Sequence, residues 1–180
     1  MGACSHPNPQ NTDSGRPLRF ETIEQFAIGR TSQEDAIRGI GQPDRTFSLE
    51  IENKVVWIYL VEWNFTGGKA EVPRATLTFD AKSGTLQSKS WDVYEGEREK
   101  TLDGARSRFK SALFKRIDAE QTNPHAVPDE IYFVDEKQGI SIEYRKARGE
   151  VSSISWWNPS DRSVAESRKK KNGIDPRYKL

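Results

Sequence analysis

An internal repeat is the sequence feature that most constrains the fold. Residues 76–91 (TLTFDAKSGTLQSKSW) and residues 141–156 (SIEYRKARGEVSSISW) align without a gap at an offset of 65. Both segments alternate apolar and polar side chains, turn at a glycine (Gly84 and Gly149) and end in Ser-x-Ser-Trp. The pattern indicates two β-hairpins of common ancestry, although alternation and a turn glycine also recur in unrelated hairpins. We therefore expect two related units.

Two short helices and a meander of strands are expected in the first unit. Thr22 and Thr31 each begin a capping-box pattern, and apolar residues follow each of them at helical spacing. Gly41, followed by Pro43, ends the second helix. The apolar period then changes from 3.6 to 2, so residues 55–65 form a long central strand ahead of the first hairpin.

One helix and three strands are expected in the second unit. Residues 101–117 carry one apolar stripe at helical spacing, with Thr101 as the cap. Three strands follow, near residues 130–134, 140–146 and 150–157. The predicted fold class is α+β: two related units of short helices plus an antiparallel β-meander, with the sheet packed on helices on one face.

The two ends of the chain differ in composition from its middle. Residues 1–18 hold three prolines among small polar residues and are expected to form a flexible leader. Residues 160–180 lack an apolar period and are expected to form a basic disordered tail. The first unit then spans residues 19–97 and the second spans residues 98–159.

Charge is distributed unevenly along the chain. Residues 162–180 carry seven basic and two acidic side chains, whereas the whole chain has a net charge of +1, so the remainder is mildly acidic. Because nucleic-acid binding requires a basic face on the folded part, this balance argues against a nucleic-acid partner. A run of basic residues at a chain end is usually solvated, and contact with anionic lipid headgroups is the alternative.

Few residues suit catalysis or metal binding. The chain has one cysteine, Cys4, which excludes an internal disulfide and a cysteine-cluster zinc site. His6 lies in the leader, and His125 lies in a proline-flanked loop where an exposed histidine is the expected state. Four acidic residues crowd one strand end, where a solvated loop is favoured over a metal site: Asp92, Glu95, Glu97 and Glu99. We assign no catalytic residue, no metal and no cofactor.

Aromatic and aliphatic side chains separate by parity in the long strand. Odd positions carry Trp57, Tyr59 and Trp63, whereas even positions begin with an aliphatic run. Because one layer of short helices covers one face of a sheet, we expect the aliphatic face to pack on the helices. The aromatic face, extended by Trp91 and Trp156, would then be open to a partner. The alternative is that the aromatic rings form the core.

Three short motifs in residues 20–92 carry a family resemblance. They are Gly29-Arg30-Thr31, Gly41-Gln42-Pro43 and Trp57-Ile58-Tyr59. This segment resembles the SmpA/OmlA (BamE-like) family of small bacterial envelope lipoproteins, in which these motifs recur within an α-α-β-β-β unit. A tandem pair of such units is also similar to the β-lactamase-inhibitor-protein fold, whose two related halves form one concave sheet.

The resemblance implies a location and a function. Gly2-Ala3-Cys4-Ser5 is similar to the end of a lipobox, with the signal peptide removed, and implies lipid attachment at Cys4. The expected protein is a non-enzymatic lipoprotein of the bacterial cell envelope, on the outer membrane facing the periplasm. It would bind another envelope protein and support membrane assembly or integrity. The alternatives are an incidental cysteine, a secreted or periplasmic inhibitor-like protein that binds an enzyme through a concave aromatic face, and an enzyme or small-ligand carrier with a pocket.

Overall fold

The computed structural model describes residues 18–65, 68–118 and 129–160. The chain divides into two compact units, Met1–Gly96 and Glu97–Leu180, and each is described here by itself. The expected boundary, after residue 97, lies one residue further along the chain. The predictions made for Cys4, the leader, His125 and the basic tail fall outside the described residues.

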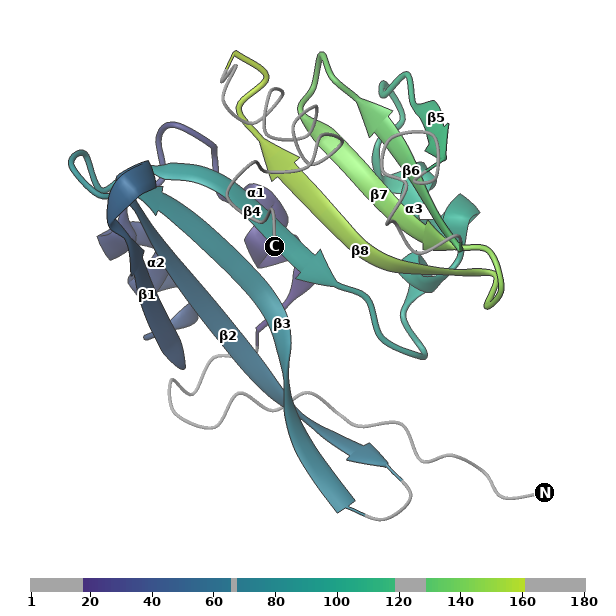
Figure 1. Ribbon diagram of the computed structural model, residues 1–180, viewed down its shortest axis with the longest axis horizontal. Coiled ribbons are helices and arrows are strands. Elements are labelled where there is room, and N and C mark those ends of the chain that lie inside the picture. Colours follow the sequence, from purple (N-terminus) through teal and green to yellow (C-terminus); the bar gives the residue numbers. More distant parts are fainter. Residues whose placement is uncertain (1–17, 66–67, 119–128, 161–180) are drawn as a thin grey trace, which may run out of the picture. The chain divides into compact units, whose positions relative to one another are not determined.

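The first unit contains an antiparallel meander of four strands. They are paired in the order β1 (Arg45–Leu49), β2 (Lys54–Phe65), β3 (Gly68–Asp80) and β4 (Leu86–Asp92) (Figure 1). A 3-10 turn, η1 (Glu50–Glu52), joins β1 to β2. The expected long central strand is confirmed, because β2 pairs with β1 on one side and with β3 on the other.

Two short helices precede these strands, α1 (Phe20–Gln25) and α2 (Gln33–Ile40). The capping box of α2 is formed by Ser32 and Asp35, so the box expected at Thr31 is wrong by one residue. The box expected at Thr22 is also wrong, because α1 begins one turn earlier and has no side-chain cap. Gly41 ends α2 as predicted, with a φ of 87° that favours glycine.

The second unit contains one short α-helix and four strands. The 3-10 turn η2 (Arg98–Lys100) leads into α3 (Leu102–Arg108), and Thr101 caps that helix as expected. The strands pair antiparallel in the order β8-β7-β6-β5. Their bounds are β5 (Lys115–Asp118), β6 (Glu130–Asp135), β7 (Ile140–Arg145) and β8 (Glu150–Trp157).

The helix expected over residues 101–117 is too long. It ends at Arg108, and residues 115–118 form strand β5 instead. The backbone N–H of Leu113 donates to the Asp135 carboxylate at 2.7 Å, and β5 pairs with β6. These long-range hydrogen bonds replace the ones that a longer helix would have made.

The predicted fold class is wrong in its balance of helix and strand. Strands hold 47% of the described residues and helices hold 21%. The three α-helices are six, eight and seven residues long, too short to form a full layer over the strands of either unit. Within the described residues the chain is therefore mostly β, with strands that dominate both units.

The two equivalent hairpins that the repeat predicts are confirmed in the strand register. Ala75 pairs with Trp91 in the β3–β4 hairpin, and Ile140 pairs with Trp156 in the β7–β8 hairpin. Both residues of the second pair lie 65 positions after those of the first. The other four pairs of the β3–β4 ladder have counterparts at the same offset in the β7–β8 ladder, which has one further pair, Arg145 with Glu150. Both ladders also contain a register shift at the same place, next to Phe79 in the first and next to Tyr144 in the second. A shared bulge is a conserved feature of related hairpins.

Candidate interaction surface

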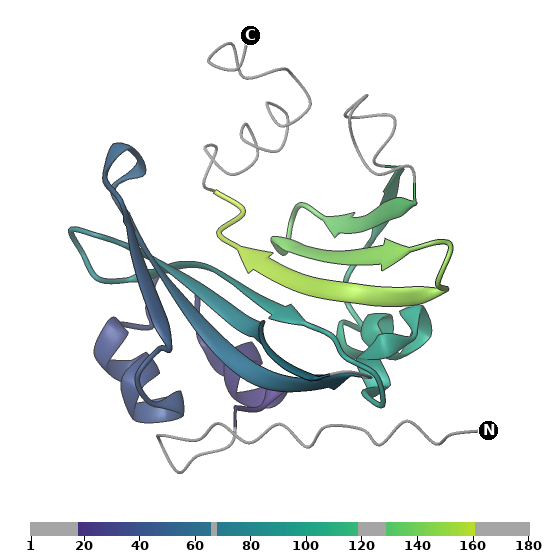
Figure 2. The same ribbon diagram turned by 60° about the horizontal axis from the view of Figure 1, so that its bottom comes forward.

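The two faces of the first unit's sheet differ in their surroundings. Trp57, Tyr59 and Val61 point to one face and are buried, together with Leu77 and Phe79 on β3. The Tyr59 hydroxyl donates to the carbonyl oxygen of Gly41, at the end of α2. Both helices lie on this side of the sheet (Figure 2). The aromatic face is therefore the core face.

The expectation that the aromatic face is open is wrong. Trp57, Tyr59, Trp91 and Trp156 are 7%, 0%, 1% and 7% exposed. Trp91 meets the ring of Phe20 edge-on with 5.8 Å between ring centroids, and Trp156 meets Phe109 at 6.0 Å. Trp63 lies in β2, and its side chain falls outside the described residues. The inhibitor-like alternative thus lacks the open aromatic face that it requires.

The physical reason is that the helices cover the face of β2 that carries its odd-numbered residues, and not the face that carries its even-numbered residues. Lys89 shows this from β4, where it lies opposite Leu77 on the core face. Its Nζ donates to the carbonyl oxygens of Ile23, Glu24 and Phe26 at 2.6 to 2.7 Å. These carbonyls lie at the end of α1 or just past it, where a helix leaves carbonyls without intrahelical partners, and that of Ile23 also accepts from the N–H of Phe26. The lysine therefore holds α1 against the aromatic face.

The opposite face of this sheet carries apolar side chains that are not covered by α1 or α2. Val56, Ile58 and Leu60 are half-buried on β2. Phe47 pairs with Val56 in the β1–β2 ladder, so Phe47 and Leu49 lie on that same face. We call the set Phe47, Leu49, Val56, Ile58 and Leu60 the open face.

Strand β1 is the most exposed part of the open face. All five of its residues are exposed, including Phe47 at 47% and Leu49 at 42%, and Ile51 in the adjoining η1 is 92% exposed. Single exposed apolar side chains are common on protein surfaces, but several of them in one place often mark an interaction surface. Sequence reasoning missed this surface, because alternation alone does not say which face the helices cover.

The buried charges of the first unit serve its packing. Lys89 is 4% exposed, and burial lowers its pKa to about 8, while the Glu24 carboxylate acts in the opposite direction. Arg74 is also 4% exposed; its guanidinium lies 4.0 Å from the Trp91 ring centroid and donates to the carbonyl of Asp92. Both cations bind backbone carbonyls, which suits structural roles rather than catalysis.

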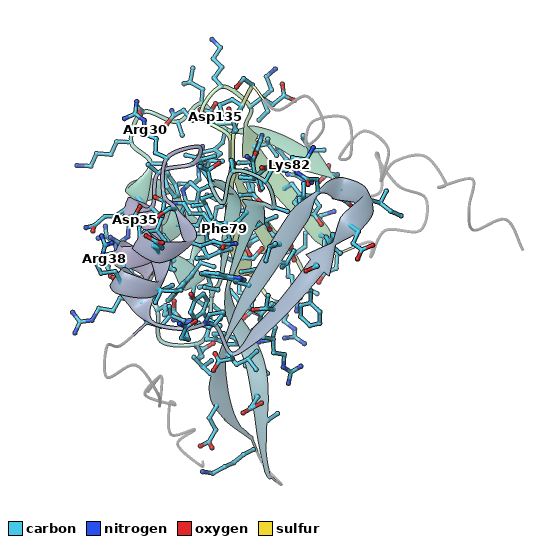
Figure 3. The ribbon with its side chains drawn as sticks, turned by 90° about the vertical axis from the view of Figure 1, so that its left-hand side faces the viewer. Arg30, Asp35, Arg38, Phe79, Lys82 and Asp135 are labelled. Atoms are coloured by element: carbon cyan, nitrogen blue, oxygen red, sulfur yellow. The ribbon has the colours of Figure 1, made fainter. Side chains whose placement is uncertain are left out.

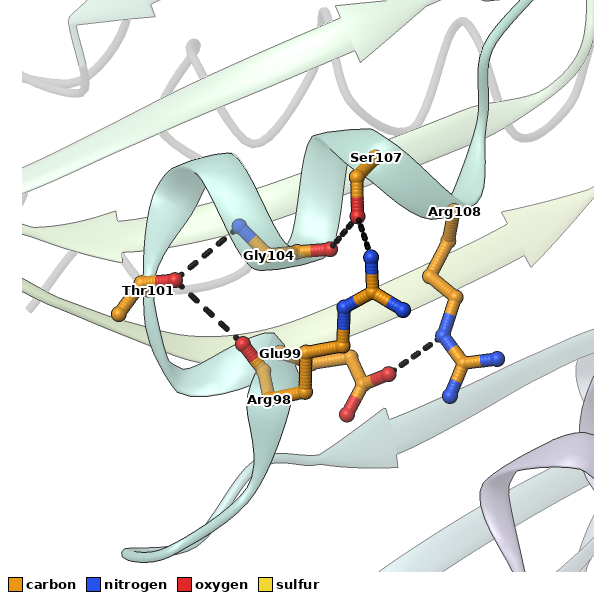
Figure 4. Close-up of polar contacts among 6 residues, drawn as sticks. All are labelled: Arg98, Glu99, Thr101, Gly104, Ser107 and Arg108. Carbon is orange, nitrogen blue, oxygen red and sulfur yellow. Dashed lines mark hydrogen bonds and ion pairs between the residues drawn. The ribbon is translucent and has the colours of Figure 1, made fainter.

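The buried charge pair of the second unit fixes α3 (Figure 4). The Arg108 guanidinium binds the Glu99 carboxylate at 2.5 Å, and Glu99 is 4% exposed. The Thr101 hydroxyl accepts from the N–H of Gly104, and the Ser107 hydroxyl donates to the Gly104 carbonyl. Glu99 is one of the four acidic residues, with Asp92, Glu95 and Glu97, for which a metal site is the alternative to a solvated loop. In the structure its carboxylate binds Arg108.

The perturbed carboxylates belong to caps and turns. On α2, hydrogen bonds from Ser32 lower the pKa of Asp35, and Arg38 beside it adds to the effect (Figure 3). Burial works to raise the pKa of Asp135, but backbone N–H donors outweigh it, so the pKa falls. Within residues 18–65, 68–118 and 129–160, no group of three histidine, cysteine or acidic residues is placed to hold a metal ion.

In the part of the chain that the structure describes, no helix is both long enough and apolar enough to cross a bilayer.

Comparison with known proteins gives two distant structural likenesses. No protein family and no curated protein matches the sequence. A DUF4309 family protein (YjgB) from Bacillus subtilis subsp. subtilis str. 168 is 13% identical, with a TM-score of 0.44 over 79% of this chain and 87% of that chain. An extracellular protein containing a SCP domain, from Bacillus anthracis str. Ames, is 10% identical, with a TM-score of 0.46 over 92% of this chain and 52% of that one. This chain thus spans about half the length of the second protein. Both similar proteins are bacterial, and one is extracellular.

Proposed function

We propose that this protein is a non-enzymatic lipoprotein of the bacterial cell envelope whose first unit binds another envelope protein. The observation that carries the proposal is the open face, with Phe47, Leu49 and the adjoining Ile51 exposed on one short strand and turn. Phenylalanine, leucine and isoleucine side chains that are exposed side by side are typical of a surface that a partner covers. Asp35, Asp135 and Glu99, by contrast, are engaged in a cap, a turn and an ion pair.

The leader supports the location in this proposal. Gly2-Ala3-Cys4-Ser5 is similar to the end of a lipobox, so Cys4 is the proposed lipid attachment site on the outer membrane, facing the periplasm. Several acyl chains on one residue anchor a protein far more firmly than a single myristoyl group does. The resemblance of residues 20–92 to the SmpA/OmlA family supports a partner in envelope assembly or integrity.

Site-specific photo-crosslinking tests the binding surface. A photoreactive phenylalanine analogue replaces Phe47 in the lipidated full-length protein, which is expressed in its native bacterium and irradiated in intact cells. The matched control places the same analogue at Thr46, which lies opposite Trp57 and so on the other side of the same strand. We expect an adduct with a different envelope protein from position 47 and no adduct with such a protein from position 46.

The proposal has a quantitative requirement as well. Phe47→Ser removes an exposed side chain, so the melting temperature should change little. An anchoring aromatic at an interface typically contributes about 2 kcal/mol, so affinity for the cross-linked partner should fall roughly thirtyfold. Equal adducts from positions 46 and 47, or unchanged affinity of the Phe47→Ser variant, would show that the open face is not the binding surface.

A further inference from the structure

The outer edge of β1 lacks the features that usually protect an edge strand. β1 pairs with β2 on one side, and no other described strand pairs with it on the other. Its sequence, Arg45-Thr46-Phe47-Ser48-Leu49, contains one charged residue, at its start. Native proteins usually place charges, prolines or bulges on such an edge, because its free N–H and C=O groups bind other strands.

The second unit provides an internal comparison. β5 is the outermost described strand of that unit's sheet, and three of its four residues are charged: Lys115, Arg116 and Asp118. The side chains of Arg116 and Asp118 form an ion pair at 3.0 Å, so both charged groups stay beside this edge strand. The same chain therefore places three charged residues on one edge strand and a single one, at the start, on the other. The difference indicates that β1 has a partner strand.

The charges around β1 identify that partner. Arg45 lies at the start of the strand, and Glu50 and Glu52 lie in the turn just past its end. A strand that adds antiparallel to β1 should therefore begin with a basic residue and be followed by acidic ones. β1 itself has this arrangement. Arg45 is available for such a contact, because its ion pair with Glu71 is long, at 3.6 Å, and over half of its side chain is exposed.

We propose that β1 pairs with β1 of a second copy of this chain, antiparallel and about a two-fold axis at Ser48. In this register Phe47 of one copy lies opposite Leu49 of the other, on the open face of both. Arg45 of each copy reaches the acidic end of the other copy's strand. The pairing goes beyond the partner binding proposed above and does not depend on it.

The pairing has a consequence for the open face. Because strand addition uses the backbone edge, it joins the open faces of the two copies into one continuous surface and leaves that surface exposed. The edge is only five residues long, so the buried area is small and the dimer is weak, with a dissociation constant on the order of micromolar. A lipid anchor would raise the local concentration of the protein and favour the dimer.

A charge-swap experiment tests the proposal. Sedimentation equilibrium of the full chain, without lipid, is measured over roughly 1 to 200 µM, a range chosen to span a micromolar constant. The wild-type mass should rise from 20.5 kDa toward twice that value. Arg45→Glu and Glu50→Arg should each self-associate at least about tenfold more weakly than the wild type, because each variant brings like charges together at two places in the dimer. An equimolar mixture of the two variants restores both opposite-charge contacts and should dimerise as the wild type does.

The controls make each outcome decisive. Lys115→Glu alters the β5 edge and should leave wild-type dimerisation unchanged. Circular dichroism should show that all variants are folded, since each substituted side chain is exposed. A wild-type chain that stays monomeric over the whole range, charge variants that dimerise as well as wild type, or a mixture that fails to recover would each overturn the pairing.

Discussion

Lys89 is predicted to make the stability of the first unit depend on pH. The side chain is buried, and burial lowers its pKa to about 8 from 10.5. In the unfolded chain the amine keeps the ordinary value. Between these two pKa values the unfolded state therefore binds more protons than the folded state. Since stability rises with pH wherever the unfolded state binds more protons, the free energy of unfolding should increase from pH 8 upward.

The size of the effect follows from the shift. One pKa unit corresponds to about 1.4 kcal/mol, and integration from pH 7 to pH 10 gives a gain of roughly 2 to 3 kcal/mol. The three carbonyls at and just past the end of α1 that accept from Nζ, and the nearby Glu24 carboxylate, favour the ammonium form. At pH 7 the lysine is therefore charged and uses all three of its donors.

Urea unfolding of wild type and Lys89→Met, at a series of pH values, measures this contribution. Methionine fills a similar volume without titrating, so the difference in unfolding free energy between the two proteins isolates the lysine. Taking this difference also cancels the contribution of Tyr59, whose pKa burial raises. The difference, wild type minus variant, should rise by roughly 2 to 3 kcal/mol between pH 7 and pH 10. A difference that stays level or falls would refute the reasoning.

Three further predictions concern core packing, the α3 cap and the anchor. Trp57→Ala should cost about 3 to 5 kcal/mol of unfolding free energy, whereas Ile51→Ala, at a 92% exposed position, should cost less than about 0.5, both by urea denaturation; equal losses would contradict the assignment of faces. Gly104→Ala should cost about 2 to 4 kcal/mol and lower the melting temperature, because a Cβ there would lie 1.9 Å from the carbonyl oxygen of Arg98; a melting temperature within a degree or so of wild type would show that η2 moves aside. Cys4→Ser in the full precursor should abolish fatty-acid labelling and release the protein from membranes, and unchanged membrane retention would remove the anchor from the account.

The hairpins could be predicted from the sequence because their determinants are local. Alternating apolar and polar residues predict the strands, and the turn glycine predicts the loop between them. The constant offset of 65 identifies the second hairpin as a copy of the first. The structure keeps these features in the register, with Gly84 and Gly149 at φ values of 66° and 68°. Their N–H groups donate to the carbonyl oxygens of Asp80 and Arg145, which are themselves 65 residues apart.

The alternation of residues along β2 could not predict which face of the sheet is buried. Alternation shows which residues share a face, but long-range contacts of the helices decide which face becomes the core. One signal was present in the repeat: Lys89 aligns with Ile154, which is fully buried on the second unit's core face. A lysine at a core position, close to helix ends, could have indicated that α1 lies on that side.

The length of α3 and the exposure of β1 depend on contacts that no local pattern encodes. An apolar stripe continues past Arg108, yet the N–H of Leu113 binds Asp135, and residues 115–118 pair with β6. Phe47 and Leu49 alternate like core residues of a strand. They are exposed because their strand is outermost in the sheet of its unit, on a face where neither α1 nor α2 lies.

Hydroxyl-radical footprinting of the full-length protein, purified and in native envelope membranes, tests the central claim most directly. The account predicts that Phe47 and Ile51 react readily in the purified protein, while Trp57 and Phe79 are protected. In envelope membranes, where we propose that the partner is present, Phe47 should become protected as well. The claim would be contradicted if Trp57 and Phe79 reacted as fast as Phe47 in the purified protein, or if Phe47 reacted equally in both preparations.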